Sequence, residues 1–220
     1  MIQPLRRAFA AVLIAASLVT AAGARADQAA DAAAAQTFIR TLADKALVLV
    51  NSTTMKDAER AEGFRALFVE AFDIPEIGRF VLGRHWKSAS PDQQQQFLKA
   101  FEDFTVLTWS TRFKDYSGVS LEILGASPGD EGFMIVESRI VRTQGDPLPV
   151  GWRVHKVGEQ WKITDILIED VSMALTQRQD FAAVIQSKSR TPLAARGEIF
   201  GALRAAQNQD HRLQGLVKAH

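Results

Sequence analysis

The sequence predicts an α+β fold, in which helices pack on one face of a curved antiparallel sheet of four strands. Apolar residues recur at helical spacing up to residue 116 and again from residue 172. Over residues 119–169 the apolar period changes to two, and short linkers rich in turn residues separate four strand-like segments. Helices first, strands next and helices last therefore predict one mixed domain.

The first 26 residues have the features of a secretory signal peptide. Arg6 and Arg7 precede an apolar run over 8–22, and Ala24 and Ala26 match the small-x-small rule for cleavage after Ala26. An uncleaved anchor is the weaker alternative, because the run is shorter than the approximately 20 residues that span a bilayer. Cleavage would lower Lys+Arg from 26 to 23 against 25 Asp+Glu, for a net charge of −2. A nearly neutral mature chain predicts no nucleic-acid partner.

The chain contains no Cys, so neither a disulfide nor thiolate chemistry is expected. After the signal segment, no apolar run reaches the length that crosses a membrane. We therefore expect a soluble periplasmic protein, a monomer, that is stabilised by its hydrophobic core alone.

Three helices are predicted before residue 87. Residues 27–52 are rich in Ala and carry one apolar stripe, and residues 54–74 carry a second stripe with several Phe. Pro75 restarts the chain into the segment 76–86, which contains a short helix that we expect Gly83 to close.

The fourth helix, within residues 88–116, has the clearest start signal. Ser90 occupies the N-cap position, Pro91 the first helical position, and Gln93 completes a capping box. Aromatic residues then follow at helical spacing, which makes this the most aromatic helix of the chain.

The four predicted strands lie within 119–125, 132–143, 148–157 and 160–170. Pro149 stands near a strand start, where the missing N–H costs little. The short linkers predict an antiparallel meander.

Helical spacing returns over 172–188 and 191–207, and 208–220 is predicted to be a flexible tail. Residues 27–207 are thus expected to form the domain, with a mainly helical part over 27–116, the sheet over 119–169, and C-terminal helices over 172–207.

The histidines do not predict a metal site. They stand at positions 85, 155, 211 and 220, without the short spacing that metal ligands need. His155 lies on a predicted strand, on the face opposite to its apolar neighbours.

Acidic residues give one weak candidate for catalysis. Neighbouring acids such as Glu102–Asp103 and Glu169–Asp170 point in different directions and cannot form a converging pair. Asp165 interrupts an apolar strand, and a buried carboxylate there could act as a general base. The simpler interpretation is a carboxylate on the wet face of the sheet.

Two aromatic-rich surfaces are expected to face one another, the helix that carries Phe97 and the sheet that carries Trp152. Periodicity does not distinguish a filled core between them from a lined pocket.

Two stretches, Phe72–Gln93 and Trp161–Ser172, resemble the MlaC family. The first contains "FDIPEIGRFVLGRHWKSASPDQ" and the second "WKITDILIEDVS", and the likeness extends over about residues 38–203. The resemblance implies an MlaC-like fold related to the NTF2-like cone shape.

The resemblance implies a periplasmic shuttle that carries phospholipid between the outer membrane and an inner-membrane ABC transporter. The implied partners are that transporter with its lipid-binding ring protein, and an outer-membrane lipoprotein complex. A bound lipid is the expected ligand, with no catalytic group, metal or cofactor. The segment "SMALTQRQDF" is similar to a branch associated with hopanoid biosynthesis, so a hopanoid is the alternative ligand.

Two other functions stay open. One is an NTF2-like enzyme with Asp165 or His155 as the base. The other is a periplasmic scaffold or chaperone with a filled core.

By the lipid-carrier interpretation, the lipid headgroup stays at the pocket mouth, where Arg84 and Arg178 are candidate residues. The predicted pocket residues are Phe97, Phe101, Phe104, Tyr116, Val136, Ile140, Val150, Trp152, Val154, Ile163, Ile166, Val171, Met173, Phe181 and Ile185.

Overall fold

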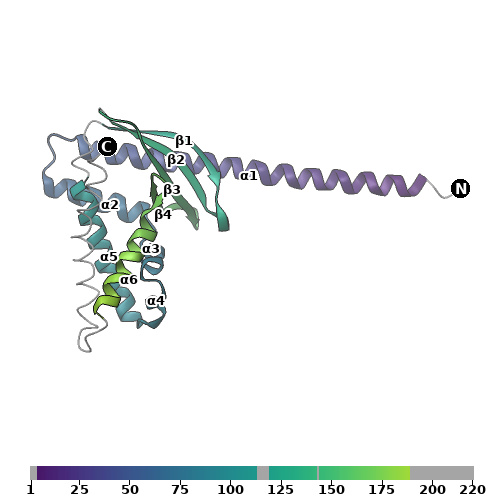
Figure 1. The fold of residues 1–220 in the computed structure, drawn as a ribbon. Coiled ribbons are helices and arrows are strands. Elements are labelled where there is room, and N and C mark those ends of the chain that lie inside the picture. The colour runs from purple at the N-terminus through teal and green to yellow at the C-terminus, as the bar shows by residue number, and fades with distance from the viewer. Residues whose placement is uncertain (1–3, 113–118, 143, 189–220) are drawn as a thin grey trace.

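The computed structural model describes residues 4–112, 119–142 and 144–188 (Figure 1). The helices are α1 (Pro4–Asn51), α2 (Asp57–Ala71), α3 (Ile74–Leu82), α4 (Arg84–Ser88), α5 (Pro91–Arg112) and α6 (Met173–Lys188). Several predictions fall outside the described residues, namely the helix over 191–207, the tail over 208–220, Tyr116, His211 and His220.

The strands are β1 (Ser120–Pro128), β2 (Met134–Val141), β3 (Leu148–Val157), β4 (Gln160–Ile168) and β5 (Val171–Ser172), with a short 3-10 turn, η2 (Asp130–Gly132), between β1 and β2. They form one antiparallel sheet in the order β1-β2-β3-β4-β5, which confirms the predicted meander.

The number of strands differs from the prediction, because a fifth strand of two residues follows β4. Glu169 and Asp170 both adopt positive φ angles, 50° and 64°. This left-handed pair turns the chain back, so that Val171 and Ser172 pair with Ile168 and Leu167. We had expected Ser172 to begin a helix, and it instead precedes α6, where its hydroxyl oxygen accepts from the Leu175 amide at 3.0 Å.

The register of the sheet places apolar residues of three strands in one row. Val136 pairs with Trp152, and Trp152 pairs with Ile166. The register shifts in β1 near Ile123 and between Arg153 and Val154, as β-bulges do. Bulges increase twist and bending, which is how this sheet becomes curved.

The C-terminal half of α1 crosses the inner face of the sheet along β1 and β2, and α2 lies beside it (Figure 1). The N-terminal part of α1 projects beyond the sheet. From Pro4 onward, the predicted signal segment is helical and continuous with the rest of α1, and its cleavage stays a prediction. No helix in the described part of the chain is both long and apolar enough to cross a membrane.

The position of α5 corrects one expectation. We expected its aromatic face to lie against the sheet, but its main neighbours are α2 and α3. Phe97 and Phe101 stack at 5.7 Å between ring centroids, and Phe181 of α6 packs edge-on to both, at 5.9 and 6.3 Å. The helical period predicted an apolar face on α5, but it carries no information on which surface covers that face.

The molecule thus contains two packed regions. The helical core joins α2, α3, α5 and α6 around Phe97, Phe101 and Phe181. The sheet core joins the inner face of the sheet to α1, around Val136, Val154 and Ile163. The end of α2 connects them, because the Asp73 amide donates to the Ile163 carbonyl oxygen at 2.9 Å.

Candidate functional site

A cavity of about 160 Å³ lies between α1, α2 and the inner face of the sheet. Helix α1 contributes Ile39, Leu42, Ala43, Ala46, Leu47 and Val50 to its wall. Helix α2 and the residue after it contribute Phe64, Leu67, Phe68 and Phe72. The sheet contributes Val119, Ser120, Leu121, Ile140, Leu148, Val150, Trp152, Ile166 and Ile168.

The wall that α1 provides follows from its sequence spacing. Ile39, Ala43, Ala46 and Val50 recur at three to four residues, so they share one face of the helix. The two alanines in the middle of this face end at Cβ, and the space beyond them is part of the cavity. This face therefore supplies an apolar surface without filling the gap to the sheet.

The opposite wall is fixed by a short hydrogen-bonded chain inside the sheet. The Trp152 indole N–H donates to the Ser138 hydroxyl oxygen at 2.9 Å, and that hydroxyl donates to the Val150 carbonyl oxygen at 2.8 Å. Ser138 is only 2% exposed. Because the polar atoms of both side chains are satisfied within the sheet, the indole offers only its carbon surface to the cavity.

Aromatic side chains of α2 close the cavity toward the helical core. Phe68 stacks on Phe72 at 4.2 Å between centroids, and Phe64 lies 6.4 Å from Phe68. Phe64 and Phe68 are also members of the helical core. Helix α2 is therefore shared between the cavity and the core that α3, α5 and α6 form.

The structure brings four of the predicted pocket residues to this cavity, namely Ile140, Val150, Trp152 and Ile166. Their contact with a lipid stays a prediction. All four lie on the inner face of the sheet, as the alternation of the strands predicted.

The other predicted pocket residues lie elsewhere. Those of the sheet core are fully enclosed by neighbouring side chains: Val136, Val154 and Ile163. Those of the helical core pack between helices: Phe97, Phe101, Phe104, Phe181 and Ile185. Val171 is 53% exposed on β5, and Met173 is half-buried at the start of α6. Tyr116 lies outside the described residues.

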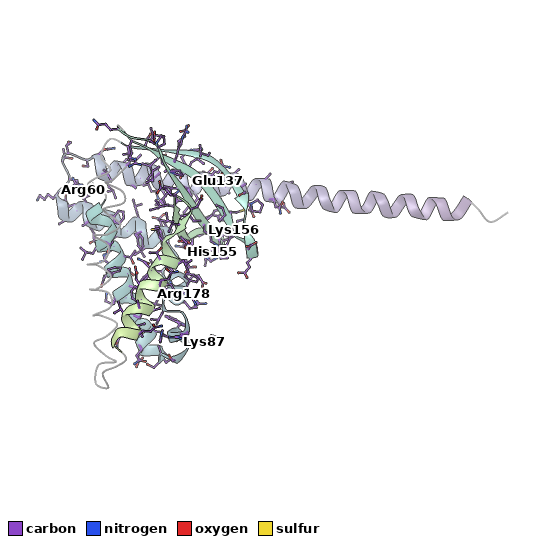
Figure 2. All side chains as sticks on the ribbon, viewed as in Figure 1. Arg60, Lys87, Glu137, His155, Lys156 and Arg178 are labelled. Atoms are coloured by element: carbon purple, nitrogen blue, oxygen red, sulfur yellow. The ribbon has the colours of Figure 1, made fainter. Side chains whose placement is uncertain are left out.

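The two arginines that we expected at the pocket mouth are also elsewhere. Arg84 is exposed on α4. Arg178 is exposed on α6, with its guanidinium carbon 4.9 Å from the centre of the Phe80 ring. In Figure 2, Arg178 and Lys87 are both labelled on the helical part of the molecule, below the sheet. The prediction was based on charge alone, which does not indicate where a helix surface lies relative to a cavity.

Sequence reasoning missed the wall that α1 and α2 provide. The apolar stripes of both segments were visible, but the surface that they cover was assigned to α5. The available signal was the pair of alanines, Ala43 and Ala46, within the stripe of α1. Small residues in an otherwise large apolar stripe can indicate space beside a helix.

The two candidate catalytic bases have structural roles outside the cavity. The Asp165 carboxylate accepts from the Ser172 hydroxyl and, at 2.9 Å, from the Ala174 amide, so it fixes the start of α6. His155 Nε2 lies 2.9 Å from Asp73 Oδ2, and Asp73 in turn caps α3 by accepting from the Glu76 amide at 3.0 Å. Neither residue is among those that line the cavity.

Among the described residues, no group of three or more His, Cys, Asp or Glu side chains is placed to hold a metal ion. The cavity walls are carbon except for Ser120. Such a surface can exclude water from hydrocarbon, and apart from the Ser120 hydroxyl its lining residues carry no acidic, basic or nucleophilic group.

Comparison with known proteins is consistent with this geometry. The chain is 28% identical over 100 residues to the "Intermembrane phospholipid transport system binding protein MlaC" of Haemophilus influenzae, which is 44% of this chain and 47% of that protein. It is 20% identical over 133 residues to the "Toluene tolerance protein ttg2D" of Pseudomonas putida, which is 59% of this chain and 62% of that protein. The chain thus spans about half to three-fifths of these curated relatives.

A solved structure has the same fold. It is a phospholipid-binding protein from Ralstonia solanacearum in complex with a phospholipid, with a TM-score of 0.63 and 22% sequence identity. The match covers 81% of this chain and 98% of that one. The family described as "MlaC protein" matches residues 32–196, from the α1 segment that faces the sheet to beyond α6. The chain belongs to the MlaC family.

Proposed function

We propose that the protein binds a phospholipid with its acyl chains in the α1–α2–sheet cavity and carries it through the periplasm. The observation that carries this proposal is the cavity itself, whose walls are apolar on every side and include a single polar residue, Ser120. The names of the Haemophilus and Ralstonia proteins, which state phospholipid transport and phospholipid binding, support the same ligand class.

The energetics suit a carrier. Removing one CH₂ from water is worth about 0.8 kcal/mol, so a 16-carbon chain needs on the order of 13 kcal/mol of shelter to cross water. A membrane interior and an apolar cavity are both dry, so transfer between them can be close to neutral and therefore reversible. A catalytic group is not required for such a transfer, and the two candidate bases have structural partners instead.

The cavity must widen to take whole acyl chains. An engineered cavity of about 150 Å³ admits one benzene molecule, and the cavity here is of similar size, about 160 Å³. We therefore propose that α1 moves away from the sheet when a lipid enters. The α1 face at the cavity is built from small and aliphatic side chains, among them Ala43, Ala46 and Val50, so opening at this face separates apolar surfaces. Nearer the N-terminal side of α1, Asp31 accepts from Lys156 of β3 and continues to join the helix to the sheet.

The partners that we propose are an inner-membrane ABC transporter with its lipid-binding ring protein, and an outer-membrane lipoprotein complex. The Haemophilus relative is named as the binding protein of an intermembrane transport system, which supports a role between two membranes. Export by the N-terminal signal segment, with cleavage after Ala26, would place the mature protein between them.

The test is mass spectrometry of organic extracts from the mature protein, purified from the periplasm without detergent. We expect close to one phospholipid per protein molecule. A hopanoid in its place would change the ligand class. A protein that yields no lipid, and takes none from phospholipid vesicles, would refute a lipid-carrying function.

A further inference from the structure

The cavity has a rim where three strands begin or end. Ser120 is the first residue of β1 and Leu148 the first of β3, while Ile140 is the last residue but one of β2. All three line the cavity, and so does Val119, directly before β1. The one polar lining residue, Ser120, is therefore located at this rim.

Arg142 follows β2 at the same rim. It comes two residues after Ile140, and strand alternation assigns both residues to the inner face of the sheet. Its side chain is half-buried, and its Nε atom is fully buried without a hydrogen-bond partner among the described residues. A buried N–H of a charged group without an acceptor is unfavourable, so an acceptor from outside the chain would stabilise it.

Two other arginines in the described part of the chain differ, because their donors are used within the protein. Arg65 binds Glu102 and Asp103, each at 2.8 Å, and Arg139 binds Glu122 at 2.6 Å. Arg139 is a useful comparison, because it lies on the same strand only three residues from Arg142 and faces the outer side of the sheet. Among the described residues, Arg142 is the arginine whose Nε is buried without such an acceptor.

We propose that Arg142 binds the phosphate group of the lipid whose acyl chains occupy the cavity, an inference that rests on the proposed function. An apolar cavity cannot take a charged phosphate, so the phosphate stays at the rim while the chains enter. The planar guanidinium donates charge-assisted hydrogen bonds that match phosphate oxygens. Arg142 therefore selects a phospholipid over a neutral lipid with the same acyl chains.

The test compares two probes that differ in the phosphate. The delipidated mature protein takes up either fluorescent dioleoyl-phosphatidylglycerol or fluorescent dioleoylglycerol from phosphatidylcholine vesicles. Arg142→Gln should weaken uptake of the phospholipid about ten-fold or more, which corresponds to roughly 1.4 kcal/mol, and leave the neutral lipid unchanged. Arg142→Lys should retain part of the preference, because it keeps the charge but not the planar fork.

Arg139→Gln is the matched control, and it should change neither uptake. Circular dichroism melting shows whether each variant is folded. Equal loss of both lipids in Arg142→Gln would overturn the proposal, because the residue would then act on the cavity as a whole. Unchanged uptake of both lipids would overturn it as well.

A further arm separates a lipid phosphate from a free anion. Inorganic phosphate alone is titrated into the delipidated protein by calorimetry. Binding of inorganic phosphate that Arg142→Gln removes, together with unchanged phospholipid preference, would make the site one for free anions and overturn the lipid assignment. If the unmodified protein takes up neither lipid, the proposed function itself fails, and this inference fails with it.

Discussion

A large side chain introduced on the cavity-lining face of α1 tests directly whether the lipid binds in this cavity. In Ala46→Phe, a phenyl ring would project from the middle of the α1 wall toward the sheet. A cavity of about 150 Å³ holds one benzene, so one ring fills the 160 Å³ available. The ring would exclude a stretch of acyl chain of similar size, roughly six CH₂ groups. At about 0.8 kcal/mol each, this is a loss of up to about 5 kcal/mol of lipid binding.

A loss of that size corresponds to more than a thousand-fold weaker binding. Stability should change little or increase, because burial of Phe gains about 1.5–3 kcal/mol, whereas the lower helix propensity costs less than about 1 kcal/mol. The assay is phospholipid per protein by mass spectrometry, together with thermal melting. We expect lipid to fall below the detection limit in a protein that melts as the unmodified one does.

Ala34→Phe is the control, since Ala34 is exposed on the same helix and does not line the cavity. It should retain the lipid. A folded Ala46→Phe protein with an unchanged amount of phospholipid would refute the assignment of this cavity. Loss of lipid from both variants would indicate an effect on α1 in general.

Three further perturbations separate structural roles from lipid binding. Phe181→Ala removes a ring that packs edge-on to two others in the helical core, so the free energy of unfolding should fall by about 3–5 kcal/mol. The amount of lipid per folded molecule, measured by mass spectrometry, should stay the same. A parallel loss of lipid would instead extend the binding site to α6. Asp165→Ala leaves the Ser172 hydroxyl and the Ala174 amide without their acceptor, so the free energy of unfolding in urea should fall by about 1–3 kcal/mol while lipid uptake from vesicles is retained. Loss of uptake in a stable protein would contradict the structural role of Asp165. The hydrogen bond and positive charge of Arg139 lower the pKa of the Glu122 carboxyl. This pair therefore stabilises the fold fully above the ordinary pKa of Glu, and its contribution is lost as the pH falls through the lowered pKa of Glu122. An NMR titration should show the pKa of Glu122 rising in Arg139→Gln, and an unchanged pKa would mean that the pair does not form in solution.

Local patterns in the sequence were sufficient where neighbouring residues determine the structure. The capping box before α5 forms as predicted, with the Ser90 amide donating to Gln93 Oε1 at 2.9 Å and the Gln93 amide donating to Ser90 Oγ at 3.3 Å. The predicted helix end at Gly83 is also confirmed, because this glycine adopts a φ of 56° between α3 and α4. Caps, turns and strand alternation depend on atoms within a few residues of each other.

The location of the cavity depended on contacts between distant segments. Trp152 and Val154 share one face of β3, yet Trp152 lines the cavity and Val154 is fully buried in the core. Alternation assigns both to the inner face but does not say whether a side chain from another element fills the space in front of them. Ala43 and Ala46 lie on the opposing wall and leave that space open, and this becomes visible only when α1, rather than α5, is known to cross the sheet. The sequence by itself determined the elements other than β5, and the faces that they bury. The pairing of those faces, and so the cavity, was decided by the tertiary packing of α1 and α2, because close packing depends on the shapes of both surfaces at once.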